Sequence, residues 1–422
     1  MKNSNIKTDR RDFLRMMVAG TCGAACHTVL APFGGGIAYA AGSGTPGPIK
    51  NFIEVFFYGG YCSQGFFPVH NNGFMRRYPT LGVTAANAAS IGRDDISMHL
   101  AFRPFVAEAT AAKIALIYNV GHPTTFSRSH EIAQKANERI DYNVNLENGV
   151  GVGAAIAQAT GNPYSLISFG GNSDFSLGGS IPARSVGSLA TGKANFWQAE
   201  WYNLTEQNMR AAAPLPATAE QQYLQTSVDS MNTGLKTLQE ISRIVPAIAF
   251  PNTDIGRKFA DITRLIQAGV GTAYFVPYGG FDTHSNQAQS HNDSFTALNA
   301  ALVALVRNLK ATPGVAGDTA WDETVLLTRT DFGRTFENQA RGTDHGHTAT
   351  QLVTGGRVVG GVYGDVMTEA QILAITTDYI GGRSVQFSAM QATKEIVGAM
   401  GLSVPFPEYV GNIRVPIGFL AV

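Results

Sequence analysis

Residues 272–284 read TAYFVPYGGFDTH, an apolar run that leads through a glycine pair to Asp282 and His284. The run is short, aromatic and β-branched, which predicts a buried strand. In open α/β sheets, ligands bind beyond the carboxyl ends of the strands, so we expect Asp282 and His284 to lie at such an end. A carboxylate and an imidazole suit a divalent metal ion or acid/base chemistry. Two ligands do not make a metal site, and an ion-paired Asp beside a hydrogen-bonded His is the simpler interpretation of this pair alone.

Two further polar clusters lie in the same half of the chain. Asp331 follows the apolar run at residues 324–328, and Asp344 and His345 stand in the glycine-flanked sequence GTDHGH, residues 342–347. Three such clusters near strand ends are what a metal centre for phosphoryl or sulfuryl transfer requires, because the ion would neutralise the ester's charge and lower the pKa of the attacking oxygen. The cofactor expected is a divalent ion, Zn²⁺, Mn²⁺ or Ca²⁺. Its predicted ligands are Asp282, His284, Asp331, Asp344 and His345.

Strands and helices alternate along the chain. The predicted strands are residues 52–58, 114–118, 166–169, 272–276, 324–328 and 351–354, and the predicted helices are residues 98–112, 131–140, 255–268 and 293–309. This alternation predicts an α/β fold of three layers, a mostly parallel sheet with helices on both faces. We expect residues 51–422 to form a single domain in which a cap or insertion occupies residues 151–240.

The amino terminus has the composition of an export signal. Residues 8–15 read TDRRDFLR, a diluted apolar run fills residues 16–30, and Ala-Tyr-Ala occupies residues 38–40. This order predicts a twin-arginine signal peptide at residues 1–40 and a linker at residues 41–50, although an amphipathic first helix is the alternative. We therefore expect a periplasmic or extracellular protein whose partner during export is the twin-arginine translocation machinery. No later stretch approaches the roughly 18 apolar residues of a membrane helix, so we expect no stable span after cleavage.

Charge and cysteine content narrow the classes of function. The 31 basic and 31 acidic residues give a formal net charge of zero, which argues against a nucleic-acid partner. Cys22 and Cys26 lie in the predicted signal, so Cys62 alone would remain and no internal disulfide could form.

Several segments resemble a known exported family. The sequences GGFDTHSNQ (279–287), DFGRT (331–335) and GTDHG (342–346) are similar to those of the family called domain of unknown function fifteen-oh-one. Its members carry twin-arginine signals and are similar to the alkaline phosphatase and sulfatase superfamily. The resemblance implies an alkaline-phosphatase-like fold, with Asp282 and His284 as one pair of metal ligands, Asp331 at the place of another pair and His345 as the late ligand histidine.

A further segment of this resemblance is Arg128-Ser129-His130, with Gln134. Ser129 precedes the helix predicted at residues 131–140, where backbone N–H groups favour an anion, but a serine at this position is most often only an N-cap. The resemblance places Ser129 near the nucleophile of the superfamily, and Ser129 or a water molecule would attack the ester. Arg334 or Arg128 would stabilise the equatorial oxygens. The predicted catalytic residues are Ser129, His130 and Arg334.

The chain also departs from the superfamily, which places a metal-binding aspartate after its first strand. Here residues 59–64 read GGYCSQ, so we expect one metal ion or none instead of two. The leading hypothesis is an exported metal-dependent hydrolase of phosphate or sulfate esters. The alternative is a catalytically inactive binding or scaffold protein of the same fold, which would present loop aromatics to a glycan or a protein. Those aromatics are Tyr61, Phe66, Phe67 and Phe74.

Overall fold

The computed structural model describes the chain between residues 48 and 421 with gaps. The described ranges are 48–122, 127–140, 149–162, 165–170, 173–179, 184–189, 237–238, 240–315, 318–376, 385–406 and 416–421. The predicted signal lies outside them, as do most of the predicted linker and residues 190–236 of the predicted cap. Among the described residues, no helix is both long enough and apolar enough to span a membrane.

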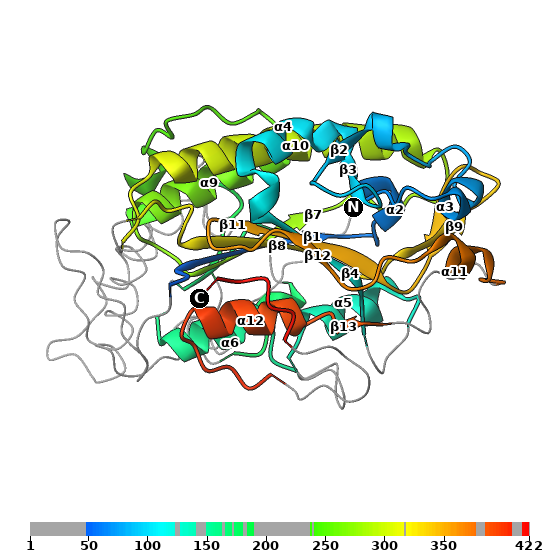
Figure 1. Ribbon diagram of the computed structural model, residues 1–422. Coiled ribbons are helices and arrows are strands. Elements are labelled where there is room, and N and C mark those ends of the chain that lie inside the picture. Colours follow the sequence, from blue (N-terminus) through cyan, green and yellow to red (C-terminus); the bar gives the residue numbers. More distant parts are fainter. Residues whose placement is uncertain are drawn as a thin grey trace, which may run out of the picture.

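One large sheet forms the middle of the molecule (Figure 1). In the part of the chain that is described, its strands follow the order β12-β4-β11-β8-β1-β7-β5-β6, with β13 beside β4. Only β11 runs antiparallel to its neighbours, and the other pairings in this sheet are parallel. The bounds are β1 (Asn51–Phe57), β4 (Ile114–Gly121), β5 (Leu166–Ser168), β6 (Arg184–Ser185), β7 (Ala273–Tyr278), β8 (Thr324–Thr330), β11 (Ala349–Gly355), β12 (Gly361–Tyr363) and β13 (Phe387–Ser388).

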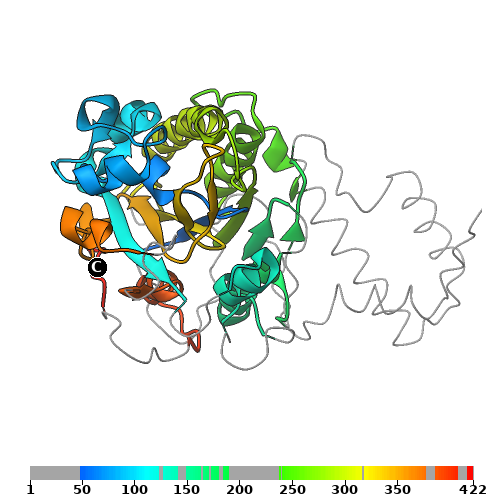
Figure 2. The same cartoon turned by 90° about the vertical axis from the view of Figure 1, so that its right-hand side faces the viewer.

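Helices cover both faces of this sheet, as Figures 1 and 2 show from two sides. One face carries α4 (Arg103–Ala109), α9 (Asp254–Gln267) and α10 (Gln287–Ala311), and the other carries α5 (His130–Glu138), α6 (Val152–Thr160) and α12 (Gln391–Ala399). The short helices are α2 (Ser63–Phe66), α3 (Asn72–Arg77) and α11 (Glu369–Leu373). The three-layer α/β fold with a mostly parallel sheet is therefore confirmed.

The helix predicted at residues 98–112 is partly wrong. Its first residues belong to β3 (Ser97–His99), which pairs with β2 (Ala88–Ser90), and α4 begins only at Arg103. Pro104 stands in the first turn of α4, where its missing N–H has no helical partner to lose, so it marks a helix start. The apolar spacing that suggested one helix spans a strand, a 3-10 turn and a helix.

Strand β1 is buried on both sides, which explains its nearly continuous apolar sequence. Ile53, Val55 and Phe57 pack into the core on one face, and Phe52 and Phe56 pack into the core on the other. The aromatic residues of the following loop join the first of these cores. Tyr61, Phe66, Phe67 and Phe74 are at most 2% exposed. The expectation that these rings are presented to a glycan or a protein is therefore wrong, because the core takes their apolar surface.

Candidate metal centre

The loop after β7 brings Asp282 and His284 together. Strand β7 ends at Tyr278, so Asp282 and His284 lie in the loop beyond the strand end, as predicted. The chain turns at Gly280, whose φ of 99° is readily adopted only by glycine. His284 Nε2 lies 2.9 Å from Asp282 Oδ1 after this turn.

Two more histidines reach the same carboxylate oxygen. His345, at the end of β10 (Thr343–His345), places Nε2 3.3 Å from Asp282 Oδ1. His130, the first residue of α5, places Nε2 3.5 Å from that oxygen and 3.1 Å from His345 Nε2. A strand-end loop, a short strand and a helix start thus bring three imidazole nitrogens to one carboxylate oxygen.

Each of these imidazole rings is also held at its other nitrogen. His130 Nδ1 lies 2.5 Å from Asp331 Oδ2, and His284 Nδ1 lies 2.7 Å from Asp344 Oδ1. His345 Nδ1 lies 2.7 Å from the carbonyl oxygen of Arg128. Of the predicted metal ligands, Asp331 and Asp344 therefore lie behind the histidines, on the side opposite to Asp282.

Asp331 is buried at the end of β8, and one of its oxygens takes several hydrogen bonds. Besides His130, Asp331 Oδ2 accepts from the backbone N–H of Gly59 at 3.1 Å and from Gln134 Nε2 at 3.2 Å. The next residue, Phe332, places its ring centroid 4.8 Å from those of both His130 and His345. These contacts fix two of the imidazole rings against the end of the strand.

Arg334 lies beneath Asp282 and is buried. Its guanidinium donates to Asp282 Oδ1 at 2.5 Å, to the carbonyl of Gly60 at 2.5 Å and to that of Thr343 at 2.8 Å. The carbonyls of Gly59 and Phe281 accept further hydrogen bonds from it. The sequence predicted that Arg334 binds the ester. In the structure its guanidinium instead holds three loops together.

The charges at the centre are set by these contacts. Partial burial raises the pKa of Asp282, but the hydrogen bond and the charge of Arg334 outweigh this and lower it to about 2. The hydrogen bond to Asp331 raises the pKa of His130 above its usual value, against the opposing effect of burial. The hydrogen bond from His284 lowers the pKa of Asp344. Asp282 therefore stays ionised across the physiological range.

Ser129 occupies the N-cap position of α5, directly before His130. Its side chain makes no capping hydrogen bond, and the residue is exposed. Its backbone N–H instead donates to Ser127 Oγ at 3.1 Å. The simplest interpretation of this serine, a capping residue, is therefore not what the structure shows.

The loop after β1 contributes backbone groups instead of a carboxylate. Gly59 donates its N–H to Asp331 and offers its carbonyl to Arg334. A side chain at Gly59 would collide with the backbone of Asp282, which an added Cβ would approach to 2.4 Å. Cys62 is fully buried, and burial raises the pKa of its thiol. The loop after β1 therefore has no carboxylate, as its sequence shows, and its backbone packs closely against Asp282 instead.

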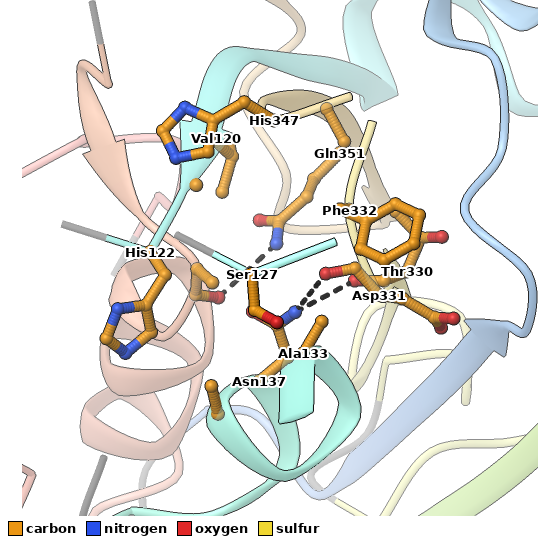
Figure 3. A pocket seen from close by; sticks show the side chains of 14 residues that line it. Val120, His122, Ser127, Ala133, Asn137, Thr330, Asp331, Phe332, His347 and Gln351 are labelled. Atoms are coloured by element: carbon orange, nitrogen blue, oxygen red, sulfur yellow. Dashed lines mark hydrogen bonds between the residues drawn. The ribbon is translucent and has the colours of Figure 1, made fainter. Parts of the chain in front are cut away.

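A small cavity lies beside Asp331 (Figure 3). It offers about 30 Å³ to the centres of water molecules, enough for roughly two of them. His122 and His347 line one side and Phe332 the other. Two buried acceptor atoms line this cavity, Asp331 Oδ1 and Gln351 Oε1, and neither has a hydrogen-bond partner among the described residues. A water molecule in the cavity could donate a hydrogen bond to either oxygen.

His130 is one of the catalytic residues predicted from the sequence, but the sequence does not place it beside Asp282. The Arg-Ser-His segment before a helix was the available signal. A helix start can be predicted from sequence, whereas the rotation of that helix against the sheet cannot. That rotation brings His130 to His345.

Comparisons with known proteins found similar solved structures and one matching family. The crystal structure of PsFucS1 sulfatase from Pseudoalteromonas sp. is similar with a TM-score of 0.38 and 10% identity, over 84% of this chain and 68% of that one. A protein in the alkaline phosphatase superfamily from Vibrio parahaemolyticus is similar with a TM-score of 0.36 and 10% identity, over 92% of this chain and 75% of that one. Among curated proteins, none matches the chain. Residues 198–372, which contain Asp282, His284, Asp331, Asp344 and His345, match the family described as "Protein of unknown function (DUF1501)", and this match confirms the family resemblance predicted from the sequence motifs.

Proposed function

We propose that the protein is an exported, metal-dependent hydrolase of phosphate or sulfate esters. One observation carries the proposal: three imidazole nitrogens lie within 3.5 Å of Asp282 Oδ1. The four side chains are between 22% and 48% exposed, so a substrate can approach them. The export part rests on the twin-arginine pattern of residues 1–40.

The donor set suits a divalent ion. Neutral imidazoles and one carboxylate are typical ligands of Zn²⁺, and Mn²⁺ accepts the same types of atom. The ligand atoms of His130, Asp282 and His345 lie within 4.8 Å of one another, so these three residues would hold the ion. Asp282 and His345 are among the ligands predicted from the sequence. When bound, it would supply positive charge against the oxygens of the ester and make an attacking hydroxyl easier to deprotonate.

Residues around the histidine cluster would supply the nucleophile, bind the ester oxygens and position Asp282. The exposed hydroxyl of Ser129 is adjacent in sequence to His130, and it is the proposed nucleophile unless a water molecule attacks. The first backbone N–H groups of α5 would bind oxygens of the ester, since a helix amino terminus favours anions. Arg334 would act by positioning Asp282 and the surrounding loops, because it is buried under them.

The alternative is a catalytically inactive binding or scaffold protein of the same fold. The observation that favours it is the loop after β1, which brings backbone groups to the site where the superfamily has a metal-binding carboxylate. Such a protein would keep the histidine cluster without turning over an ester.

The test combines metal analysis with a substrate screen. The purified protein, loaded with Zn²⁺ or Mn²⁺, is assayed on aryl phosphates and aryl sulfates beside Ser129→Ala and His345→Ala. We expect turnover of one ester class and a fall of at least about 100-fold in His345→Ala, since even a lost orienting partner of a ligand costs about 10- to 100-fold. A metal-loaded protein that turns over none of these esters would support the scaffold function instead.

A further inference from the structure

We infer that Gln134 and Asn137 are positioning residues of the candidate metal centre. Together with His130 they hold helix α5 on Asp331, and this attachment sets where His130 Nε2 lies. The inference rests on the metal dependence of the proposed function. It adds two residues that would contact neither the ion nor the ester, and it identifies the contacts that fix the rotation of α5 against the sheet.

Three side chains of α5 bind the end of β8. His130 Nδ1 lies 2.5 Å from Asp331 Oδ2, and Gln134 Nε2 donates to the same oxygen at 3.2 Å. Asn137 Nδ2 donates to the backbone carbonyl of Asp331 at 2.5 Å and to that of Thr330 at 3.2 Å, as Figure 3 shows. The three side chains stand at positions i, i+4 and i+7, which lie on one face of a helix. We call them the polar stripe of α5.

Apolar packing contributes little to this attachment. The buried residues of α5 are Ala133, Ala136, Asn137 and Glu138, so its buried face carries no large apolar side chain. The isoleucine of the helix, Ile132, is 39% exposed. A helix that covers a sheet is usually held by a stripe of apolar side chains. In α5 the hydrogen bonds of the polar stripe take over that task.

The cavity beside Asp331 shows that α5 is also incompletely packed on this face. Ala133, Ala136 and Asn137 line the cavity from the helix side. Protein interiors leave few voids larger than a water molecule, so a close-packed helix cannot turn without clashes. Beside this cavity, α5 has space to turn once its hydrogen bonds to β8 are lost.

A small rotation of α5 would move His130 out of the centre. A side-chain atom lies about 5 to 6 Å from the helix axis, so a rotation of about 20° moves it by roughly 2 Å. A bond between zinc and an imidazole nitrogen is itself only about 2.0 to 2.1 Å long. His130 Nε2 lies 3.1 Å from His345 Nε2 and 3.5 Å from Asp282 Oδ1, so a shift of this size would remove it from the ligand set.

The competing explanation is that Asp331 orients His130 without help from the rest of α5. Asp331 Oδ2 also accepts a hydrogen bond from the backbone N–H of Gly59 at 3.1 Å, so the loop after β1 holds this carboxylate too. If that contact were enough, loss of Gln134 or Asn137 would change the stability of the protein but not its affinity for an ion.

The test measures the Zn²⁺ affinity of the purified full-length chain after a chelator has removed bound metal. The variants are Gln134→Met and Asn137→Leu, which remove the donor groups and keep the side chains at a similar size. Both changes are also made in His130→Ala, because each double-mutant cycle then isolates the effect that acts through His130. The control is Ile132→Ala, on the exposed side of the same helix.

We expect Gln134→Met and Asn137→Leu each to weaken Zn²⁺ binding about 10-fold, at the low end of the range for residues behind a metal ligand. In His130→Ala the same changes should alter the affinity by less than about 2-fold, since their route to the ion is gone. Ile132→Ala should bind Zn²⁺ like the wild type. Equal losses with and without His130, or no loss in either variant, would overturn the inference.

Circular dichroism and thermal melting check that each variant folds. Asn137 is buried and Gln134 is only partly buried, so Gln134→Met decides if Asn137→Leu does not fold. Crystal structures of the metal-free variants give a second readout that needs no ion. We expect His130 Nε2 to lie farther from His345 Nε2 than 3.1 Å in these variants, and an unmoved His130 in both would contradict the inference.

These results separate the inference from the proposed function. A wild type that binds Zn²⁺ but hydrolyses no ester overturns only the hydrolase. A wild type that binds no Zn²⁺ overturns the metal dependence of the proposed function and the part of the inference that concerns affinity. The metal-free crystal structures then decide whether the polar stripe sets the position of His130.

Discussion

Charged side chains occur in two places on the same sheet, and they differ in access to solvent. At the strand ends, Asp282 and His284 are 48% and 46% exposed. Within the sheet, Glu54 of β1 and Arg329 of β8 form an ion pair at 3.2 Å with side chains at most 1% exposed. A charge in the middle of a strand can only serve the fold, because no ligand reaches it. A charge in the loop that follows a strand can also serve a ligand.

Helix α5 connects the two places. Its first residue, His130, belongs to the candidate metal centre, and its last, Glu138, is buried near Glu54 and Arg329. Glu138 accepts hydrogen bonds from Tyr58 Oη at 3.0 Å and from the backbone N–H of Phe175 at 2.8 Å. Burial, and to a lesser extent the charge of Glu54, raise the pKa of Glu138 to about 8. Near neutral pH this carboxyl group is therefore mostly protonated.

The largest effect is expected from breaking the buried pair. Arg329→Ala leaves the carboxylate of Glu54 buried without its partner, so we expect the free energy of unfolding to fall by about 3 to 5 kcal/mol. Denaturant unfolding measures this change, and Zn²⁺ affinity of the folded fraction should stay unchanged. The double variant Glu54→Gln with Arg329→Met is the control, since replacing both partners costs much less. A loss under about 1 kcal/mol in Arg329→Ala would show that the pair is not what holds this part of the sheet.

An intermediate effect is expected from Glu138, and it depends on pH. The folded-state pKa of about 8 lies above the ordinary value of 4.5 for a glutamate. Stability from this group is therefore complete below pH 4.5 and decreases as the pH rises toward 8. At about 1.4 kcal/mol per pH unit, the wild type should lose roughly 2 kcal/mol between pH 6 and pH 7.5 relative to Glu138→Gln. Parallel stability curves for the two proteins would mean that Glu138 is ionised in the fold.

The smallest effect is expected from Ser129. Its hydroxyl makes no capping hydrogen bond, so Ser129→Ala should change the free energy of unfolding by less than about 0.5 kcal/mol. Thr253→Ala is the matched control, because Thr253 Oγ1 accepts from the N–H of Gly256 at 3.2 Å at the start of α9. Losing that cap should cost about 1 kcal/mol. Equal losses in the two variants would return Ser129 to the role of an ordinary cap.

The sequence predicts the charged residues at the strand ends better than the buried ion pair within the sheet. Apolar runs that end in glycine, Asp or His mark the strand ends, so Asp282, His284 and His345 could be singled out as candidate site residues. Glu54 is a single charged residue within the apolar run of β1. Its partner Arg329 is 275 positions away, so no local sequence pattern predicts the ion pair. The difference between a residue that binds an ion and one that orients a histidine is also not encoded locally. Asp331 and Asp344 stand in the same kind of sequence cluster as Asp282 and His345, and only the structure shows that they contact the Nδ1 atoms of His130 and His284.

The contacts of Arg334 bear on the order of folding and metal binding. Its guanidinium joins Gly59, Phe281 and Thr343, and Gly59 is 275 positions away in sequence. Contacts between such distant segments form late, because the entropy of closing long loops has to be overcome first. The histidine cluster is therefore complete only once β1, β7 and β8 have paired. In zinc fingers the ion drives folding, but here it would enter a finished protein, and its removal would leave the chain folded.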